Sequence, residues 1–340
     1  MTYLLERVII VLYLIGGVRI MQDNIFIDFS KVIYLFAYRI IYNILRLFIK
    51  QVPEQVTVFA IHNNNVRNYL ALYSQKPPLI FTKNKRFATF TKKKYGFIST
   101  DFTIVTTFQQ VIAILKSEKI ILDDYYPASY IIDERKEVWN IWHAYSVYKK
   151  IGFDSPVYNR RSTLAKKRFA QNFKRYNKIF VRSEVEKAIF KSAYQIADEA
   201  IIIKPDLFHS YFIRNRKTKK EKNLVVYAPT FRPYHYDYRK VYERLVEFFP
   251  ESNVIASYHP QTIKMEKNQL ENTTNLATDE LVAKAQVIIS DYSSLLIEAH
   301  ELLPGAKLFQ VVDLIDYEYY KKTQGTNDYS YAVDINKLFV

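Results

Sequence analysis

The sequence predicts an α/β protein made of two doubly wound, Rossmann-like halves that face a cleft. Its expected strands are short, continuous apolar runs, which are typical of parallel sheets covered on both faces. Expected helices lie between these runs, and such alternation of strand and helix indicates an α/β architecture. The chain has 340 residues, which suggests two domains, and 49% of them are hydrophobic, so a large core can form.

The first 50 residues precede this alternation, and we expect amphipathic helices there. Residues 8–18 are apolar but too short to cross a bilayer, which needs about 20 residues. Residues 31–50 predict a helix with a mostly basic stripe over about one third of its circumference. The stripe consists of Lys31, Arg39, Asn43, Arg46 and Lys50. This pattern indicates a helix in the headgroup plane of an anionic leaflet, although a core helix with a solvated edge would look similar.

Strands and helices alternate from residue 51 onward. The expected strands are 55–61, 78–82, 119–123, 138–142, 178–182, 200–203, 224–228, 253–258, 286–290 and 307–311. Helices are expected between them, for example at 238–248 and at 294–303, where Pro304 and Gly305 end the second one. Residues 213–223 are rich in Lys and Arg and predict a linker. The expected domains are therefore 51–212 on the acceptor side and 224–340 on the donor side, after the N-terminal helices 1–50.

The composition constrains the partners. A net charge of +15 indicates an anionic partner, such as a phosphorylated substrate, a membrane surface or a nucleic acid. Cysteine is absent, which excludes disulfides and thiolate metal sites. A basic nucleic-acid-binding protein is an alternative, but no helix-turn-helix, zinc-finger or RNA-recognition pattern supports it.

Polar residues gather after the expected strands of the second half, where doubly wound folds bind ligands. They are Thr230, Arg232, His259, Asp291, Ser293 and Ser294. If a helix begins at Ser293 and Ser294, its unpaired N–H groups and the two hydroxyls form an anion site suited to phosphate. Simple helix capping by Asp291 or Ser293 is the alternative interpretation. The guanidinium of Arg232 has a planar shape that suits phosphate oxygens.

In the first half, His143 directly follows an expected strand, and Lys149 and Lys150, six and seven residues later, are candidate phosphate contacts. His259 precedes Pro260, which favours an imidazole presented on a loop. The other histidines have no such placement and are expected to be structural or exposed: His62, His209, His235 and His300. No glycine-rich phosphate loop, HExxH or GxSxG motif is present, and we expect neither a cofactor nor a metal ion.

Four motifs in order resemble the CDP-glycerol glycerophosphotransferase family, which contains teichoic acid primases and polymerases. They are WHAYSVYKKIG, VVYAPTFR, SYHP and DELVAKAQVIISDYSSLLIEA, within about residues 119–325. Ala144 stands where a glycine is commoner in the family, and this feature is similar to primase-type members.

The resemblance implies a GT-B-like fold and transfer of glycerol phosphate or ribitol phosphate from a CDP-alditol, with release of CMP. The acceptor would be a hydroxyl of an undecaprenyl-diphosphate-linked glycan at the cytoplasmic face of the membrane. His143 would be the general base, and His259, Ser293 and Ser294 would hold the donor pyrophosphate, with Arg232 as a further phosphate ligand. A GT-B glycosyltransferase that uses a nucleotide sugar is the alternative, because a fold alone does not define a substrate.

Overall fold

The computed structural model describes residues 25–62, 64–73, 78–82, 87, 99–100, 104–208, 220–266, 278–327 and 335–339. Among these residues the chain divides into two compact units. Unit 1 comprises Met1–His143 and Tyr158–Leu207, and unit 2 comprises Ala144–Val157 and Phe208–Val340. The apolar segment 8–18 and most of the expected linker 213–223 lie outside the described residues.

Unit 1 contains a parallel sheet with the strand order β3-β2-β1-β4-β5-β6-β7. Its strands are β1 (Val56–Ala60), β2 (Leu79–Thr82), β3 (Ser99–Thr100), β4 (Lys119–Leu122), β5 (Glu137–Asn140), β6 (Lys178–Val181) and β7 (Ile201–Ile203). The order reverses between β1 and β4, and in a doubly wound fold ligands bind outside the strand ends at such a switch point.

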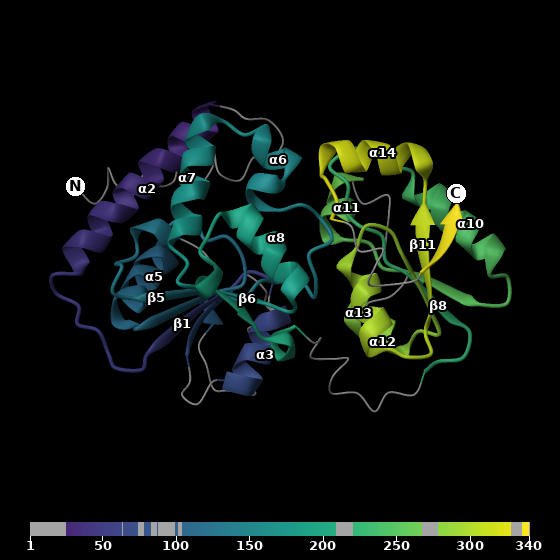
Figure 1. Ribbon diagram of the computed structural model, residues 1–340, viewed down its shortest axis with the longest axis horizontal. Helices are drawn as coiled ribbons and strands as arrows, with labels where there is room; N and C mark the ends of the chain where they lie inside the picture. The colour runs from purple at the N-terminus through teal and green to yellow at the C-terminus, as the bar shows by residue number, and fades with distance from the viewer. Residues whose placement is uncertain are drawn as a thin grey trace. The chain divides into compact units, whose positions relative to one another are not determined.

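Helices pack around this sheet (Figure 1). They are α2 (Ile25–Leu45), α3 (Asn64–Tyr73), α5 (Ile104–Lys116), α7 (Thr163–Lys174) and α8 (Glu184–Tyr194), with short 3₁₀ turns at Ser129–Ile131, Asp198–Ala200 and Pro205–Leu207. The 3₁₀ turn Gly152–Asp154 belongs to unit 2, and the short helix α6 (Pro156–Asn159) spans the boundary of the two units in the chain. Serine side chains begin two of the helices: Ser162 accepts the N–H of Ala165 at the start of α7, and Ser183 accepts that of Glu186 at the start of α8.

Unit 2 contains a second parallel sheet, with the order β12-β11-β10-β8-β9. Its strands are β8 (Leu224–Tyr227), β9 (Asn253–Ala256), β10 (Val287–Ser290), β11 (Lys307–Val312) and β12 (Asn336–Phe339). Its helices are α10 (Tyr238–Phe248), α11 (Pro260–Met265), α12 (Thr278–Lys284), α13 (Ser294–Leu302) and α14 (Leu314–Thr323). Here the strand order reverses between β8 and β10, which is again the expected place for a ligand.

Side chains of β8 alternate between two hydrophobic clusters. Val225 and Tyr227 pack with α10, whereas Leu224 and Val226 pack with α12 and α13. Figure 1 shows α10 on one side of β8 and β11, and α12 with α13 on the other. Both faces of the sheet are therefore covered, and this explains why its strands are continuous apolar runs in the sequence.

The α/β prediction is confirmed, and the ten expected strands are present with shifts of one or two residues at their ends. The sequence analysis missed two edge strands, β3 and β12, because Ser99–Thr100 and Asn336–Phe339 contain too few apolar residues to form a run. The strand expected at 138–142 ends earlier, at Asn140. His143 therefore lies on a turn beyond the strand.

The segment 144–157, which the sequence analysis included in the domain 51–212, belongs to unit 2. The backbone N–H of Lys150 donates to the carbonyl of Gly325 at 3.1 Å, and Asn327 donates from its side chain to Val147 and Lys149 carbonyls. Gly325 has a φ of 73°, and a Cβ atom there would lie 3.2 Å from Cβ of Lys150. The glycine thus permits both the left-handed backbone and the close approach.

Helix α2 packs one face against unit 1. Leu35, Tyr38 and Tyr42 are buried on that face. Near its start, the buried Asp28 forms an ion pair with Arg168 of α7 at 2.6 Å. One face of α2 is therefore part of the core of unit 1. This agrees with the alternative of a core helix, as far as that face is concerned.

Candidate active site

Titratable side chains follow three neighbouring strands of the first sheet. His62 comes two residues after β1, Asp124 two residues after β4, and His143 three residues after β5. These strands are adjacent and parallel, so their carboxyl ends lie at one edge of the sheet. The three residues thus meet at the switch point of unit 1.

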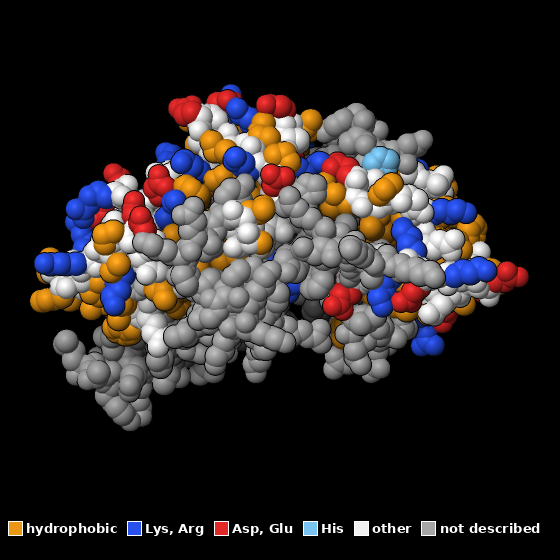
Figure 2. All heavy atoms as spheres, turned by 90° about the horizontal axis from the view of Figure 1, so that it is seen from below, with side chains coloured by type: hydrophobic (Ala, Val, Ile, Leu, Met, Phe, Trp, Pro, Cys, Tyr) orange, Lys and Arg blue, Asp and Glu red, His pale blue; other side chains and the backbone are white. Residues whose placement is uncertain are grey.

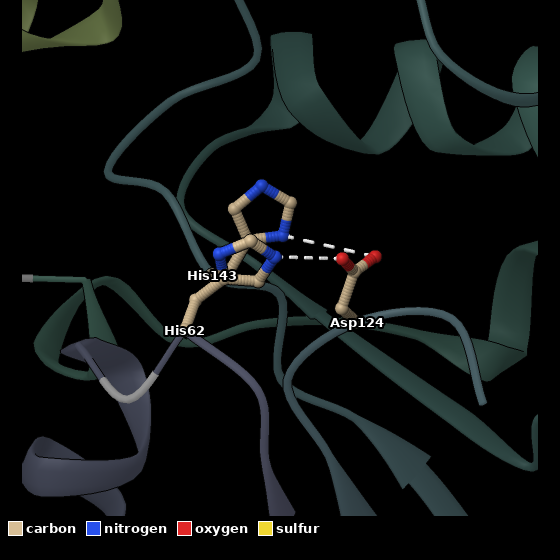
Figure 3. A group of neighbouring side chains, drawn as sticks. All are labelled: His62, Asp124 and His143. Atoms are coloured by element: carbon tan, nitrogen blue, oxygen red, sulfur yellow. Dashed lines mark hydrogen bonds and ion pairs between the residues drawn. The ribbon is translucent and has the colours of Figure 1, made fainter. Parts of the chain in front are cut away.

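The carboxylate of Asp124 lies beside the two imidazoles, and Figure 3 shows one nitrogen of each ring facing it. Nε2 of His62 is 2.8 Å from Oδ2 of Asp124, and Nδ1 of His143 is 3.9 Å from Oδ1. The two rings stack with their centroids 4.2 Å apart. All three side chains are partly exposed, so a substrate can reach them.

A strained turn presents His143. Trp142 has a φ of 54°, which an L-residue rarely adopts. Its N–H donates to Oδ1 of the fully buried Asn140 at 2.8 Å, which holds the turn. The indole of Trp142 packs on His143, with ring centroids 4.2 Å apart, and meets Phe190 edge-on at 5.1 Å. Strain of this kind persists only where the surroundings enforce it, and it is found often at functional sites.

Neighbouring charges determine the protonation of this cluster. Burial opposes ionisation of Asp124, but attraction to His143 and the hydrogen bond from His62 outweigh it and lower the pKa of Asp124. Burial also disfavours the cationic form of His62, yet its hydrogen bond to Asp124 raises the pKa of His62. The buried Asp123 fixes the loop below, because its two oxygens accept the N–H groups of Ile61 and His62 at 2.8 and 2.9 Å.

The second cluster lies at the switch point of unit 2. Asp291 follows β10, and its Oδ1 accepts the N–H groups of Thr230 at 2.8 Å and Tyr292 at 2.7 Å. The backbone after β8 is thereby tied to the backbone after β10. Thr230 presents a buried hydroxyl that has no hydrogen-bond partner among the residues that the structure describes. Such a group is well placed to bind a ligand, because buried hydroxyls are rarely left unpaired.

Arg232 has partners that the sequence analysis did not expect. It is 1% exposed, and it donates to Oδ2 of Asp291 at 2.8 Å and to Oδ2 of Asp316 at 2.7 Å. The ring of Tyr236 lies 3.9 Å from its guanidinium carbon. Although burial disfavours the charge, attraction to the two carboxylates raises the pKa of Arg232. The guanidinium of Arg232 is therefore buried against two carboxylates, a placement that the sequence analysis did not expect.

Ser293 and Ser294 begin helix α13. Oγ of Ser293 accepts the N–H of Leu295 at 3.2 Å, so Ser293 caps the helix. Both serines are partly exposed. Capping and anion binding are compatible here, because one cap leaves other first-turn N–H groups to face a ligand.

His259 caps a short helix and is exposed. Its Nδ1 accepts the N–H of Gln261 at 3.1 Å, so a neutral ring carries its proton on Nε2, where it can donate to an oxygen. The sequence analysis placed His259 on a loop, whereas Pro260 directly starts α11. Proline is well suited to the first helical position, which explains the difference.

Lys149 lies in unit 2 beside this cluster. Burial lowers the pKa of its ammonium to about 8, while attraction to Asp291 partly opposes the shift. Its Nζ lies 5.7 Å from the ring centroid of Tyr320. Lys150, in contrast, is exposed. Of the two lysines expected to contact phosphate, Lys149 is therefore the one held beside the switch point.

Sequence reasoning missed His62, Asp124 and Asp316. The first two follow expected strands, so the strand-end argument used for the second half would have identified them. Asp316 lies inside α14 and accepts hydrogen bonds from Arg232, Tyr234 and Tyr292. No local signal marks it, because its main partner is 84 residues away in the chain.

Comparison with known proteins agrees with the motifs. Residues 43–327 match the sequence profile of the family described as CDP-Glycerol:Poly(glycerophosphate) glycerophosphotransferase. The chain belongs to this family. The predicted resemblance is therefore confirmed.

Several relatives of this glycerophosphotransferase family member have names that refer to teichoic acid synthesis. The chain is 28% identical over 226 residues to the teichoic acid glycerol-phosphate primase of Bacillus subtilis (strain 168), a match that covers 61% of this chain and 59% of that protein. It is 25% identical over 291 residues to the teichoic acid ribitol-phosphate primase of Bacillus spizizenii, covering 75% and 71%. The match to the first relative thus spans less than two thirds of its length.

A solved structure also resembles the family member. A structure of the wall teichoic acid polymerase TagF with CDPG has a TM-score of 0.64 and 15% sequence identity, and the match covers 92% of this chain and 85% of that one. At this identity the likeness concerns the fold, an α/β architecture with parallel sheets.

Proposed function

We propose that this protein transfers glycerol phosphate or ribitol phosphate from a CDP-alditol to a hydroxyl of an acceptor linked to undecaprenyl diphosphate, and releases CMP. The observation that carries the proposal is the position of His143 at the switch point of unit 1, with Nδ1 3.9 Å from Asp124. An imidazole beside a carboxylate is suited to remove a hydroxyl proton. Family membership supplies the substrate class.

The reaction is a displacement at phosphorus. The acceptor oxygen forms a bond to the phosphorus that carries the alditol, and the bond from this phosphorus to the CMP oxygen breaks. The proton of the acceptor hydroxyl moves to His143, and CMP leaves with the electron pair. A positioned base typically contributes about 10²–10⁴-fold to the rate of such a step.

Unit 2 would hold the donor. The N-terminus of α13 with Ser293 and Ser294 can accept the pyrophosphate, and Nε2 of His259 can donate to the leaving phosphate as its charge grows. The ammonium of Lys149 adds a positive charge beside Asp291. Arg232 would act indirectly, because it holds Asp291 and hence the backbone of Thr230 in place.

The second part of the proposal is attachment to the cytoplasmic face of an anionic membrane through helix α2. Large apolar side chains are exposed along it and just after it: Phe29, Ile33, Phe36, Ile40, Ile44, Leu47 and Phe48. Most of them lie on the face opposite Leu35, Tyr38 and Tyr42. Figure 2 shows hydrophobic side chains beside Lys and Arg at the left end of the molecule, where α2 ends in Figure 1. Such a surface suits peripheral binding.

No helix in the described part of the chain is long and apolar enough to cross a membrane. Arg39 and Lys50 are exposed beside the apolar face and can approach anionic headgroups. A peripheral position would bring the enzyme to a lipid-linked acceptor, and this gives the apolar face a function.

A donor screen tests the reaction. The full chain would be incubated with CDP-glycerol, CDP-ribitol or UDP-glucose together with a lipid-linked acceptor, and the released nucleotide would be measured. We expect CMP from one of the CDP-alditols and no UDP. Release of UDP with sugar transfer would instead identify a glycosyltransferase.

Two variants test the roles of the histidines. His143→Ala should lose most of the turnover and bind CDP-alditol almost as well as the parent, because it affects the chemical step alone. His259→Ala should lose donor affinity as well as turnover. His300→Ala, which changes an exposed histidine of α13, is the control. Near-parental turnover of His143→Ala at saturating donor and acceptor would contradict the base assignment.

A further inference from the structure

His62 is the one member of the unit 1 cluster that the proposed function does not use. It is 45% exposed, and its hydrogen bond to Asp124, at 2.8 Å, is shorter than the 3.9 Å separation between Asp124 and His143. Its ring also covers His143 face to face, with 4.2 Å between centroids. Asp124 therefore has its closer contact with His62, while His143 contacts both members of that pair.

We propose that His62 is a positioning residue which, protonated and paired with Asp124, keeps the stacked His143 neutral and ready to accept a proton. This inference rests on the proposed function, because it assigns His62 a task in preparing the base. It extends that function to a residue outside the motifs that identify the family.

Electrostatics within the cluster supports this assignment. Two imidazolium rings stacked at 4.2 Å would repel each other strongly, so the cluster does not readily hold two positive charges. The hydrogen bond to Asp124 raises the pKa of His62 although the ring is partly buried. Because Asp124 lies 2.8 Å from His62 and 3.9 Å from His143, the closer pair is the one that takes the first proton in this assignment. Protonation of His143 is then opposed by the neighbouring cation. Interacting sites of this kind titrate as a coupled pair.

Other titratable groups face the cluster without replacing this pair. Asp123 lies below it and favours the cationic form of His62. The buried hydroxyls of Tyr176 and Tyr194 sense the charge of Asp124, which contributes to raising their pKa values beyond the effect of burial. Neither tyrosine ionises near neutral pH. His62 and Asp124 are the titratable groups seen in direct contact with His143.

A shared metal ion is a different assignment for the same residues, whose ligand atoms lie within 4.8 Å of one another. A metal ion bound to imidazole lies near the plane of the ring, about 2.0–2.1 Å from the nitrogen. The rings of His62 and His143 are stacked with only 27° between their planes. Both facing nitrogens point toward Asp124, but the nearly parallel rings lie in separate planes with their centroids 4.2 Å apart. One ion cannot lie in both ring planes, so the geometry favours a hydrogen-bonded pair.

The test measures the titration of each imidazole in the full chain by NMR, after isotope labelling of its six histidines. His62→Phe keeps a flat ring and removes the charge. In this variant the pKa of His143 should rise by about one pH unit, because Asp124 then acts on His143 without a compensating cation. His62→Lys restores a cation without the ring and should reverse most of that rise.

The control is His235→Phe. His235 also has a carboxylate partner, Glu266 at 3.6 Å, but it lies in unit 2 and is exposed. This change should leave the titration of His143 where it was. The acidic limb of the pH profile of kcat/KM should move upward with His143 in His62→Phe, a shift that a purely structural role of His62 would not produce.

The outcomes separate this inference from the proposed function. If CMP is released but the titration of His143 is the same in the parent and in His62→Phe, the role of His62 is overturned and the reaction stands. If no CDP-alditol yields CMP but the titration moves, the reaction is overturned and the pairing stands. Stoichiometric, tight binding of Zn²⁺ that abolishes both titrations would also overturn the inference.

Discussion

Arg232 and Asp316 are joined by two hydrogen bonds to the same oxygen: Nε and Nη2 of the arginine donate to Oδ2 of the aspartate at 2.9 and 2.7 Å. Both residues are buried. The contact connects the loop after β8 with helix α14. Because Asp291 accepts from the same guanidinium, one cation holds two acids at the switch point of unit 2.

The first prediction concerns this buried network. Asp316→Ala should lower the free energy of unfolding by about 3–5 kcal/mol, because removal of one partner leaves a buried charge insufficiently compensated. Glu243→Ala is the matched control, since it breaks an exposed ion pair with Arg239 and should cost less than about 1 kcal/mol. Urea unfolding of the full chain measures both changes. Equal losses in the two variants would show that the buried network does not stabilise unit 2.

The second prediction separates capping from anion binding at α13. Ser293→Asp should preserve stability, because aspartate caps a helix as well as serine does. It should nevertheless abolish binding of CDP-glycerol, because it places a negative charge beside the phosphates. Ser294→Ala should weaken binding by about 1.5–3 kcal/mol through the loss of one hydrogen bond to a charged group.

Calorimetry measures the donor affinity, and thermal unfolding measures the stability of each variant. Ser293→Ala is the reference for loss of the cap, at a cost of about 1 kcal/mol in stability. If Ser293→Asp binds CDP-glycerol like the parent, the start of α13 is only a capped helix.

The third prediction is a pH dependence due to Lys149. Burial lowers its pKa to about 8, so the free protein loses this charge as the pH rises through that value. Phosphate favours the charged ammonium, and binding of CDP-glycerol should therefore take up a proton above pH 8 and weaken as the pH rises further. Below about pH 7 the lysine is charged in both states and adds no pH dependence.

Titration calorimetry between pH 7 and 9.5 in two buffers measures both the affinity and the proton uptake. Lys149→Met should bind more weakly at pH 7 and show a flatter pH dependence. Lys150→Met changes an exposed neighbour and should retain the slope of the parent. A slope that persists in Lys149→Met would assign the proton uptake to another group.

The fourth prediction concerns the exposed face of α2. Replacement of Phe36 and Ile40 by Ser should weaken binding to vesicles that contain phosphatidylglycerol by about tenfold or more, because each immersed apolar side chain contributes up to about 1.5–3 kcal/mol. Stability should change little, since these side chains are 66% and 45% exposed. Turnover of a water-soluble acceptor analogue should remain.

Phe248→Ser removes an aromatic ring of similar exposure, 61%, from α10 and is the matched control. Deletion of residues 1–50 is a poor test, because it also removes the buried Tyr38 and Tyr42 and the ion pair between Asp28 and Arg168. Undiminished sedimentation of the Phe36 and Ile40 variant with vesicles would show that this face binds something other than lipid.

The helices and strands that the sequence predicts correctly are those determined by patterns within a few neighbouring residues. Strands such as β4 and β10 are marked by three consecutive apolar residues, and the sequence predicts α10 with its observed ends, 238–248. The prediction from neighbouring residues was wrong about the end of the strand that precedes His143. The apolar run WNIW suggests a strand to 142, but Asn140 bonds the backbone of Trp142 and ends the strand two residues earlier.

The sequence by itself determined the fold class, most strands, and the strand ends where polar side chains gather, because these follow from the apolar pattern within a few neighbouring residues. Only the tertiary structure decided which polar groups meet. His62 contacts Asp124 across 62 residues because β1 and β4 are neighbours in the sheet, and Arg232 contacts Asp316 across 84 residues because α14 packs near the end of β8. Strand order and helix packing arise from contacts distant in sequence, so no local pattern encodes them.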